Sequence, residues 1–216
     1  MAVSSADAWN EYPLVVITPW SARAEMGRRE AKALFERIIG ERAYRVEGLR
    51  KLLEKFGVNL DFSYASLQSL NDWFIGAASS SPEHPSVPDD RTLSVCEDIA
   101  LYLGEAMIMR DSSLRWELLT SRKSDPDYQS PAIVGFRNAP GWAHLALSGQ
   151  VCGYAIGVLE DRMSKIADLD IEVRGKSIAL PGESLRFPLK RDYFVGVLER
   201  AKEFTSSGYW ENPEGE

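Results

Sequence analysis

The stretch from Ser94 to Met109, SVCEDIALYLGEAMIM, constrains the fold more than any other part of this chain. Its apolar residues recur at helical spacing, and it follows the one long Pro/Ser-rich segment of the sequence. This pattern predicts a buried or half-buried helix near the middle of the molecule. Because the same stretch carries acids and a tyrosine among its apolar residues, it is also the first place to look for a functional site.

Asp98, Tyr102 and Glu105 share one side of this predicted helix. At about 100° per residue they fall within roughly 60° of one another, while Glu97 lies further to one side. Gly104 is unfavourable inside a helix by about 1 kcal/mol relative to Ala. We therefore expect Gly104 to mark a close contact with the backbone of another segment.

Three interpretations of this acidic face remain open. The side chains can form the solvent face of an amphipathic helix. They can belong to a buried network in which an acid pairs with a cation such as Arg115 or Arg137, since an unpaired buried charge is costly. They can also serve as a general acid and base, or as metal ligands. The candidate catalytic residues are Asp98, Tyr102 and Glu105, and the candidate binding residues are these three together with Arg115 and Trp116.

Recognised catalytic and metal-binding motifs are missing from the sequence. It has no G-x-S-x-G elbow, no phosphate-binding P-loop and no G-x-G-x-x-G motif. The only two histidines are His84, in a proline-rich loop, and His144, for which a structural role is favoured, and no CxxC is present. Asp125-Pro-Asp127 lacks the other ligands of a calcium loop, so a turn is favoured there. We expect no metal, no cofactor and, on balance, no enzymatic activity.

The net charge of −7 bears on the partners of this protein. Binding to nucleic acid needs concentrated Lys and Arg, so an acidic chain argues against a nucleic-acid ligand and suits a basic protein partner. Two cysteines in apolar stretches do not suggest a disulfide framework, and the N-terminus lacks a signal-peptide pattern. The apolar run 139–159 is interrupted by glycines, a proline and polar residues. We expect a cytoplasmic protein that does not contact a membrane. Its expected partner is another protein, and a homo-oligomer is also possible.

The first half of the chain is predicted to be helical after a short strand. Leu14 to Thr18 is β-branched and predicts that strand. Residues 22–56 predict a helix with opposite charges at i,i+4, which Gly40 divides into two segments. Ser63 is expected to cap a short helix. The segment 77–90 is rich in proline and serine and is predicted to be a loop.

The second half is predicted to combine strands and helices. The predicted strands are 114–118 and 131–136, followed by a hairpin of 169–173 and 177–180, and the predicted helices are 142–163 and 191–204. Gly149, Gly153 and Gly157 would lie on one face of the first helix and permit close backbone packing. The expected fold class is α+β, mostly helical, with a small antiparallel sheet in the second half. We expect a single domain, 1–216, divided into a helical part (1–76), a loop (77–90), a helix-plus-sheet part (91–206) and a frayed tail (207–216).

Three motifs in the middle of the chain resemble those of a group of uncharacterised bacterial proteins. They are D-I-x-x-Y-x-G-E in the central helix, then L-x-W in "LRWELL", then Y-x-x-P-x-x-x-G-F in "DYQSPAIVGF". The upstream segment "LDFSYASLQSLNDWF" is also similar, so the resemblance covers about residues 60–136. The group implies no activity. In size and acidity the chain is similar to toxin-neutralising immunity proteins, which suggests an interaction role.

Two functional hypotheses follow from the sequence. The leading one is a non-enzymatic cytosolic protein that acts by binding a protein partner, as immunity proteins do. The alternative is a small-molecule enzyme or ligand binder whose site includes Asp98, Tyr102 and Glu105, which requires a cavity that these side chains reach.

Overall fold

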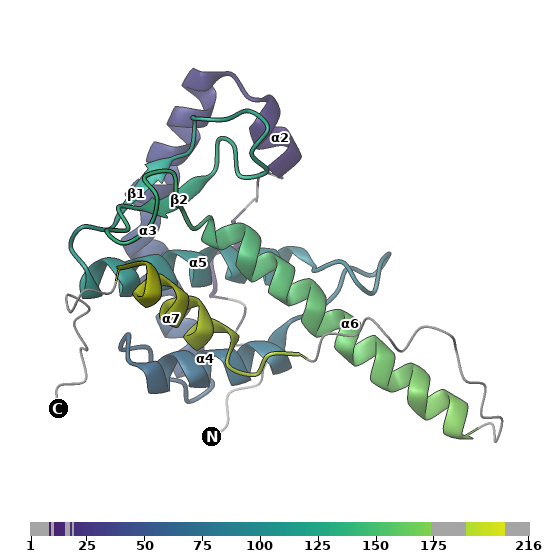
Figure 1. Ribbon diagram of the computed structural model, residues 1–216. Coiled ribbons are helices and arrows are strands. Elements are labelled where there is room, and N and C mark those ends of the chain that lie inside the picture. The colour runs from purple at the N-terminus through teal and green to yellow at the C-terminus, as the bar shows by residue number, and fades with distance from the viewer. Residues whose placement is uncertain (1–8, 10, 16–17, 19, 174–188, 206–216) are drawn as a thin grey trace.

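The computed structural model describes residues 9, 11–15, 18, 20–173 and 189–205 (Figure 1). These residues form six helices and one two-stranded antiparallel sheet, which confirms a mostly helical α+β fold. In chain order the elements are α2 (Trp20–Glu25), α3 (Arg28–Glu54), α4 (Tyr64–Ala77), α5 (Asp90–Arg110), β1 (Arg115–Leu118), β2 (Pro131–Val134), α6 (Leu147–Val173) and α7 (Tyr193–Thr205).

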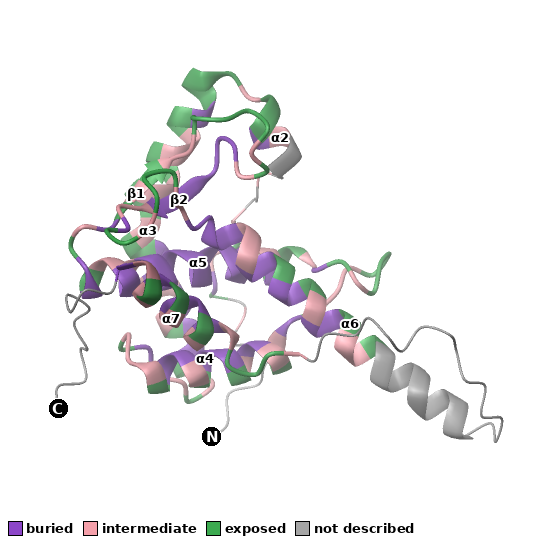
Figure 2. Ribbon diagram, viewed as in Figure 1, coloured by how far each residue is buried: buried purple, intermediate pink, exposed green. Residues whose placement is uncertain are grey.

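Helix α5 lies at the centre of the fold. It packs against α3, α6 and α7, and 15 of its 21 residues are buried (Figures 1 and 2). Asp89 caps its first turn, because the side chain accepts a hydrogen bond from the Thr92 backbone N–H at 2.8 Å. Since other helices surround α5, its polar side chains must find partners inside the protein.

The helical segment predicted at 22–56 is divided at Gly27. The prediction of a break at Gly40 was wrong. Gly27 has an extended backbone (φ −66°, ψ 148°) and separates α2 from α3, whereas α3 continues through Gly40. A single glycine costs only about 1 kcal/mol inside a helix, which the packing of a 27-residue helix easily offsets. The predicted strand at Leu14–Thr18 is also wrong for its described residues, because Leu14, Val15 and Thr18 are not in a strand.

Polar caps and internal hydrogen bonds fix the connections around α4. Ser63 caps α4, as predicted, by accepting a hydrogen bond from Ser66 N at 3.0 Å. The loop 77–90 closes on itself through Asp89 N to Ser79 O at 3.0 Å and Ser81 N to Val87 O at 2.8 Å. These contacts bring the C-terminal end of α4 next to the start of α5.

The two predicted strands in the middle of the chain pair with each other. Trp116 faces Ile133 in the antiparallel register, and Leu145 adds an isolated bridge to Ile133 on the other side. Gly135, at the end of β2, has φ +99°, and a Cβ there would lie 2.2 Å from Ser113 O. Glycine is required at this position because both the backbone angle and the space exclude a side chain.

Helix α6 begins at Leu147, and not at Trp142 as predicted, and it continues past Met163 to Val173. Residues 169–173 belong to it, so the first strand of the predicted hairpin is wrong, while 177–180 and 207–216 lie outside the described residues. Five alternating residues fit a helix as well as a strand, which explains the error. A Cβ added at Gly153 or Gly157 would meet no atom of the described chain within 4 Å, so these glycines do not form the predicted backbone contact there.

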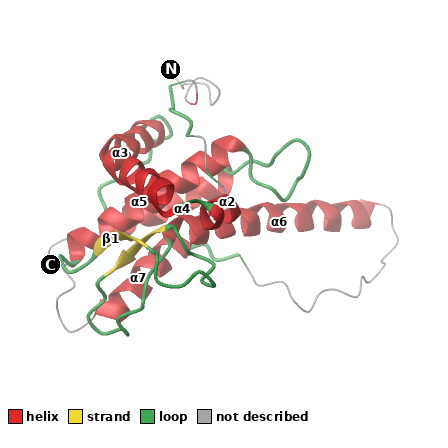
Figure 3. Ribbon diagram, turned by 90° about the horizontal axis from the view of Figure 1, so that it is seen from above, coloured by secondary structure: helices red, strands yellow, loops and turns green. Residues whose placement is uncertain are grey.

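Helix α7 completes the core where the sequence predicts it. Its residues Phe194, Val197, Leu198 and Ala201 are buried, and the helix contacts α4 and α5. Figure 3 shows that helices make up most of the described chain and that β1 and β2 form one small sheet. None of the helices in the described ranges has the length and apolar character needed to cross a lipid bilayer.

Candidate functional site

The acidic face of α5 is turned toward protein and not toward solvent. Asp98 and Tyr102 are fully buried, with relative exposures of 0%, whereas the Glu105 side chain is 28% exposed. The interpretation as a solvent face is therefore wrong for Asp98 and Tyr102. The three side chains contact three different parts of the described chain, and Asp98 lines a cavity.

Asp98 forms the centre of a buried ionic cluster with Arg45 of α3. Arg45 Nε and Nη2 donate to the two carboxylate oxygens of Asp98, each at 2.7 Å, so the pair is bidentate. Tyr12 OH also donates to Asp98, and Arg45 Nη2 donates to Ser94 Oγ at 3.1 Å. Arg45 Nη1 donates to the Pro13 carbonyl. This cluster joins the N-terminal segment to α3 and α5.

Burial acts on the proton affinity of the groups in this cluster. It raises the pKa of the Asp98 carboxyl to about 7, although Arg45 and Tyr12 act in the opposite direction. Burial also raises the pKa of Tyr12, and the Asp98 charge adds to this effect. Tyr12 therefore stays a hydrogen-bond donor, and the Asp98 carboxyl holds a proton more strongly than an exposed carboxyl does.

Glu97 holds a second buried ion pair beside the first. Arg23 Nη2 donates to Glu97 Oε1 at 3.0 Å, and Ser148 Oγ of α6 donates to Glu97 Oε2 at 2.7 Å. Arg23 Nε donates to Thr18 O at 3.1 Å, and the Arg23 side chain is 2% exposed. Nη1 of Arg23 is buried as well, and it has no hydrogen-bond partner among the residues that the structure describes.

Tyr102 has a structural environment. Its hydroxyl accepts a hydrogen bond from Phe62 N at 2.7 Å and lies 3.1 Å from Ser66 Oγ. Its ring stacks on that of Phe62, with 4.6 Å between the centroids. Phe62 has φ +68°, an unusual backbone angle for a non-glycine residue. The contacts of Tyr102 thus fix the turn before α4 and leave its hydroxyl engaged.

Glu105 lies at the edge of the α3–α5 contact. Its Oε1 accepts from Arg42 Nε and from Trp116 Nε1, both at 3.1 Å. The Trp116 ring lies over Gly104, where an added Cβ would come within 2.0 Å of Trp116 Cζ2. Gly104 thus marks a close approach of a side chain from β1, whereas the expected contact with another backbone is wrong.

The cations expected to neutralise these acids were wrongly assigned from the sequence. Arg115 pairs with Glu117 at 2.9 Å, and Arg137 lies 3.4 Å from Asp111. The actual partner of Asp98 is Arg45 of α3. Arg45 lies one helical turn before Leu49, and both residues are buried on the same face of α3. An arginine on an apolar stripe was the available signal, because such a position is buried and a buried charge needs a partner.

A cavity of about 440 Å³ opens between the N-terminal segment, α2, α3 and α5. Its charged floor is formed by Arg23, Arg45, Glu97 and Asp98. Its walls and rim are formed by Leu14, Val15, Thr18, Leu34, Arg37, Ile38, Glu41 and Leu101. A cavity of this size with a few polar groups among apolar walls is typical of a small-molecule site.

Comparison of the chain with protein-family models, with curated proteins and with solved structures finds no match.

Proposed function

We propose that this protein binds a small organic molecule in the cavity above Arg23 and Asp98, with a carboxylate of the ligand against Arg23. The observation that carries the proposal is Arg23, which lines the cavity and whose Nη1 is a buried donor without a hydrogen-bond partner in the described part of the chain. A buried donor without an acceptor costs about 1–3 kcal/mol. A ligand with an acceptor group removes this cost, which makes Arg23 an anchor for the ligand.

The remaining polar atoms of the floor favour an acceptor on the ligand. Both carboxylate oxygens of Asp98 already accept from Arg45, and both oxygens of Glu97 accept from Arg23 and Ser148. The acids are therefore engaged, and the unused hydrogen-bonding capacity is a donor. A carboxylate suits it because charge-assisted hydrogen bonds to arginine are about twice as strong as neutral ones.

The walls favour an apolar body on the same ligand. Leu34 and Ile38 of α3 and Leu101 of α5 line the cavity beside the charged floor. Its volume of about 440 Å³ lies in the range of about 300–1,000 Å³ that is typical for small-molecule sites. Amphipathic monocarboxylic acids, with one anionic end and an aliphatic or aromatic body, are the chemical class that matches both features.

The test uses a set of aliphatic and aromatic monocarboxylic acids together with their neutral methyl esters. Binding is followed by saturation-transfer NMR and by thermal shift. At least one acid should bind more tightly than its ester, since only the acid supplies a charged acceptor to Arg23. In Ile38→Trp the indole fills the cavity, and binding should be lost.

Ala43→Trp is the matched control, because Ala43 is an exposed residue of the same helix that does not line the cavity. This variant should bind the acid like the wild type. The proposal fails if no acid binds, if acids and esters bind equally, or if Ile38→Trp binds as well as the control.

Binding of a protein partner, as in an immunity-like protein, is the second proposal. It is supported by Trp142, a large aromatic side chain that is 71% exposed. Aromatic residues are enriched in protein interfaces. Light scattering of the purified chain tests one such partner, a second copy of this chain. A concentration-dependent dimer that Trp142→Ala abolishes supports binding through this surface, and a monomer at all concentrations argues against a homo-oligomer.

A further inference from the structure

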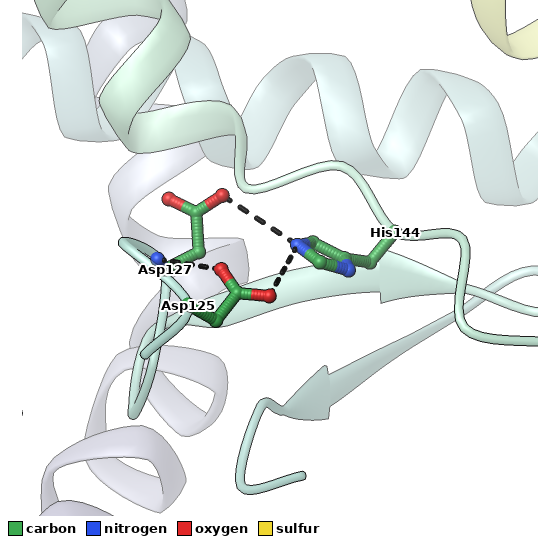
Figure 4. A group of neighbouring side chains, drawn as sticks. All are labelled: Asp125, Asp127 and His144. Atoms are coloured by element: carbon green, nitrogen blue, oxygen red, sulfur yellow. Dashed lines mark hydrogen bonds and ion pairs between the residues drawn. The ribbon is translucent and has the colours of Figure 1, made fainter. Parts of the chain in front are cut away.

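The fold brings Asp125, Asp127 and His144 together in a cluster outside the cavity (Figure 4). One ligand atom from each residue lies within 4.8 Å of the others. The two aspartates lie in the connection between β1 and β2, and His144 comes from the segment before α6. The turn predicted for Asp125–Asp127 is present, since Tyr128 N donates to Asp125 O at 3.0 Å.

Backbone hydrogen bonds hold both sides of this cluster on the sheet. Leu145, next to His144, exchanges two hydrogen bonds with Ile133 of β2, at 2.9 and 3.0 Å. Ser130 N donates to Asp127 O at 3.0 Å, and Leu119 N donates to Ser130 O at 3.1 Å. The three side chains are therefore positioned by the fold before any ligand arrives, which lowers the cost of binding an ion.

The hydrogen bond of the other imidazole nitrogen directs Nε2 toward the carboxylates. His144 Nδ1 lies 3.1 Å from the Trp142 carbonyl, which can only accept, so Nδ1 carries the proton of this bond. In the neutral ring Nε2 then has a lone pair, and this lone pair faces two carboxylate oxygens. Such an Nδ1–H to carbonyl bond is the usual outer-shell support of a metal-ligating histidine.

The distances within the cluster fit a metal ion better than direct ion pairs. Nε2 lies 3.5 Å from Asp127 Oδ2 and 3.8 Å from Asp125 Oδ2. Charge-assisted N–H to carboxylate hydrogen bonds are shorter, at about 2.7–2.9 Å. Ligand atoms that surround a tetrahedral ion with bonds of about 2.0–2.2 Å lie about 3.4 Å apart. The two distances from Nε2 are therefore close to those between ligands of one cation, and all three ligand atoms lie within 4.8 Å of one another.

We propose that Asp125, Asp127 and His144 bind a first-row divalent transition-metal ion such as Zn²⁺ or Mn²⁺. One imidazole with two carboxylates suits these ions, whereas Ca²⁺ and Mg²⁺ prefer sites made of oxygen ligands alone. The side chains are 18%, 23% and 33% exposed for His144, Asp125 and Asp127, so the ion can enter from solvent. Three protein ligands leave at least one coordination position for water or another ligand.

The experiment uses the full chain after treatment with chelator. Isothermal titration with Zn²⁺ and Mn²⁺ should show one equivalent bound, and Co²⁺ should give visible d–d bands from a site with a nitrogen ligand. His144→Gln and Asp127→Asn should each weaken binding by more than the roughly 10- to 100-fold that outer-shell changes cost. Both substitutions keep the size of the side chain, and circular dichroism checks that the variants fold.

His84→Gln is the matched control, because His84 is the other histidine of the chain and lies in the loop 77–90. It should leave the affinity unchanged to within about two-fold, as expected for a residue that does not contact the ion. The proposal is overturned if the wild type binds none of the transition metals, if only Ca²⁺ or Mg²⁺ binds, or if His144→Gln and Asp127→Asn bind like the control.

Discussion

Two ion pairs join the same two helices, α3 and α5, in very different surroundings. In the inner pair the side chains of Arg45 and Asp98 are 6% and 0% exposed, and two bonds of 2.7 Å join them. In the outer pair the side chains of Arg42 and Glu105 are 41% and 28% exposed, with a single bond of 3.1 Å. Two arginine–carboxylate pairs that lie one or two helical turns apart thus differ in hydration: the inner pair is desolvated, and the outer pair is open to water.

The difference teaches that burial decides what an ion pair does in this protein. A buried pair must be complete, because removal of one partner leaves an uncompensated charge in a medium of low dielectric constant. An exposed pair gains little, since water screens both charges before and after folding. The inner pair therefore fixes the position of α3 on α5 at the cavity floor, and the outer pair adds little to stability.

The largest expected effect is that of removing one member of the inner pair. Arg45→Met should lower the free energy of unfolding by about 3–5 kcal/mol, because Asp98 stays buried without its cation and must either carry an unpaired charge or take up a proton. Chemical denaturation measures this loss. The double variant Arg45→Met/Asp98→Leu removes both charges and should recover more than half of it. A single variant within about 1 kcal/mol of the wild type would show that the pair is not desolvated in solution.

The second effect is a pH dependence that comes from Asp98. Its pKa rises from 3.8 to about 7 in the folded state, so the native protein keeps a proton that the unfolded chain releases. The stability from this group is fully present below pH 3.8 and is lost as the pH rises to about 7. The wild type should therefore lose stability relative to Asp98→Asn across this window, by at most about 1.4 kcal/mol per pH unit.

Denaturation of both proteins at a series of pH values checks this prediction. Above about pH 7 the difference between them should become constant. If the wild type instead gains stability relative to Asp98→Asn between these pH values, the folded carboxyl has a lowered pKa, and Arg45 outweighs the burial of Asp98.

The smallest effect belongs to the outer pair. Arg42→Gln should cost less than about 1 kcal/mol, because both partners remain accessible to water and Trp116 still donates to Glu105. Lys32→Gln, which breaks the exposed pair with Glu36 on the same helix, is the control and should cost no more. A loss of more than about 2 kcal/mol in the free energy of unfolding for Arg42→Gln would show that the outer pair is desolvated like the inner pair.

Local patterns predicted most elements of this fold. The periodicity of α5 and α7, the Ser63 cap of α4 and the alternation of β1 are all confirmed, because each depends on residues that are neighbours in sequence. The errors occur where local signals are weak. Five residues at 169–173 cannot separate a helix from a strand, and a single glycine at Gly40 cannot stop a helix that its packing stabilises.

The candidate site was only partly predictable. The sequence identifies Asp98, Tyr102 and Glu105 as one row on α5, and the structure keeps them on that helix but gives each a different environment. Arg23 and Glu97, which form part of the cavity floor, were missed, as was the neighbourhood of His144. Their partners are far along the chain: 74 residues separate Arg23 from Glu97.

By itself, the amino-acid sequence determined most of the helices and strands and which acids share a helix face, since these depend on periodicity and caps. Only the tertiary structure decided that Asp98 meets Arg45, that Tyr102 is enclosed by the turn at Phe62, and that Asp125, Asp127 and His144 gather on the sheet. The physical reason is that pairing between distant residues follows from how whole helices pack, and burial then fixes the charge state of each group.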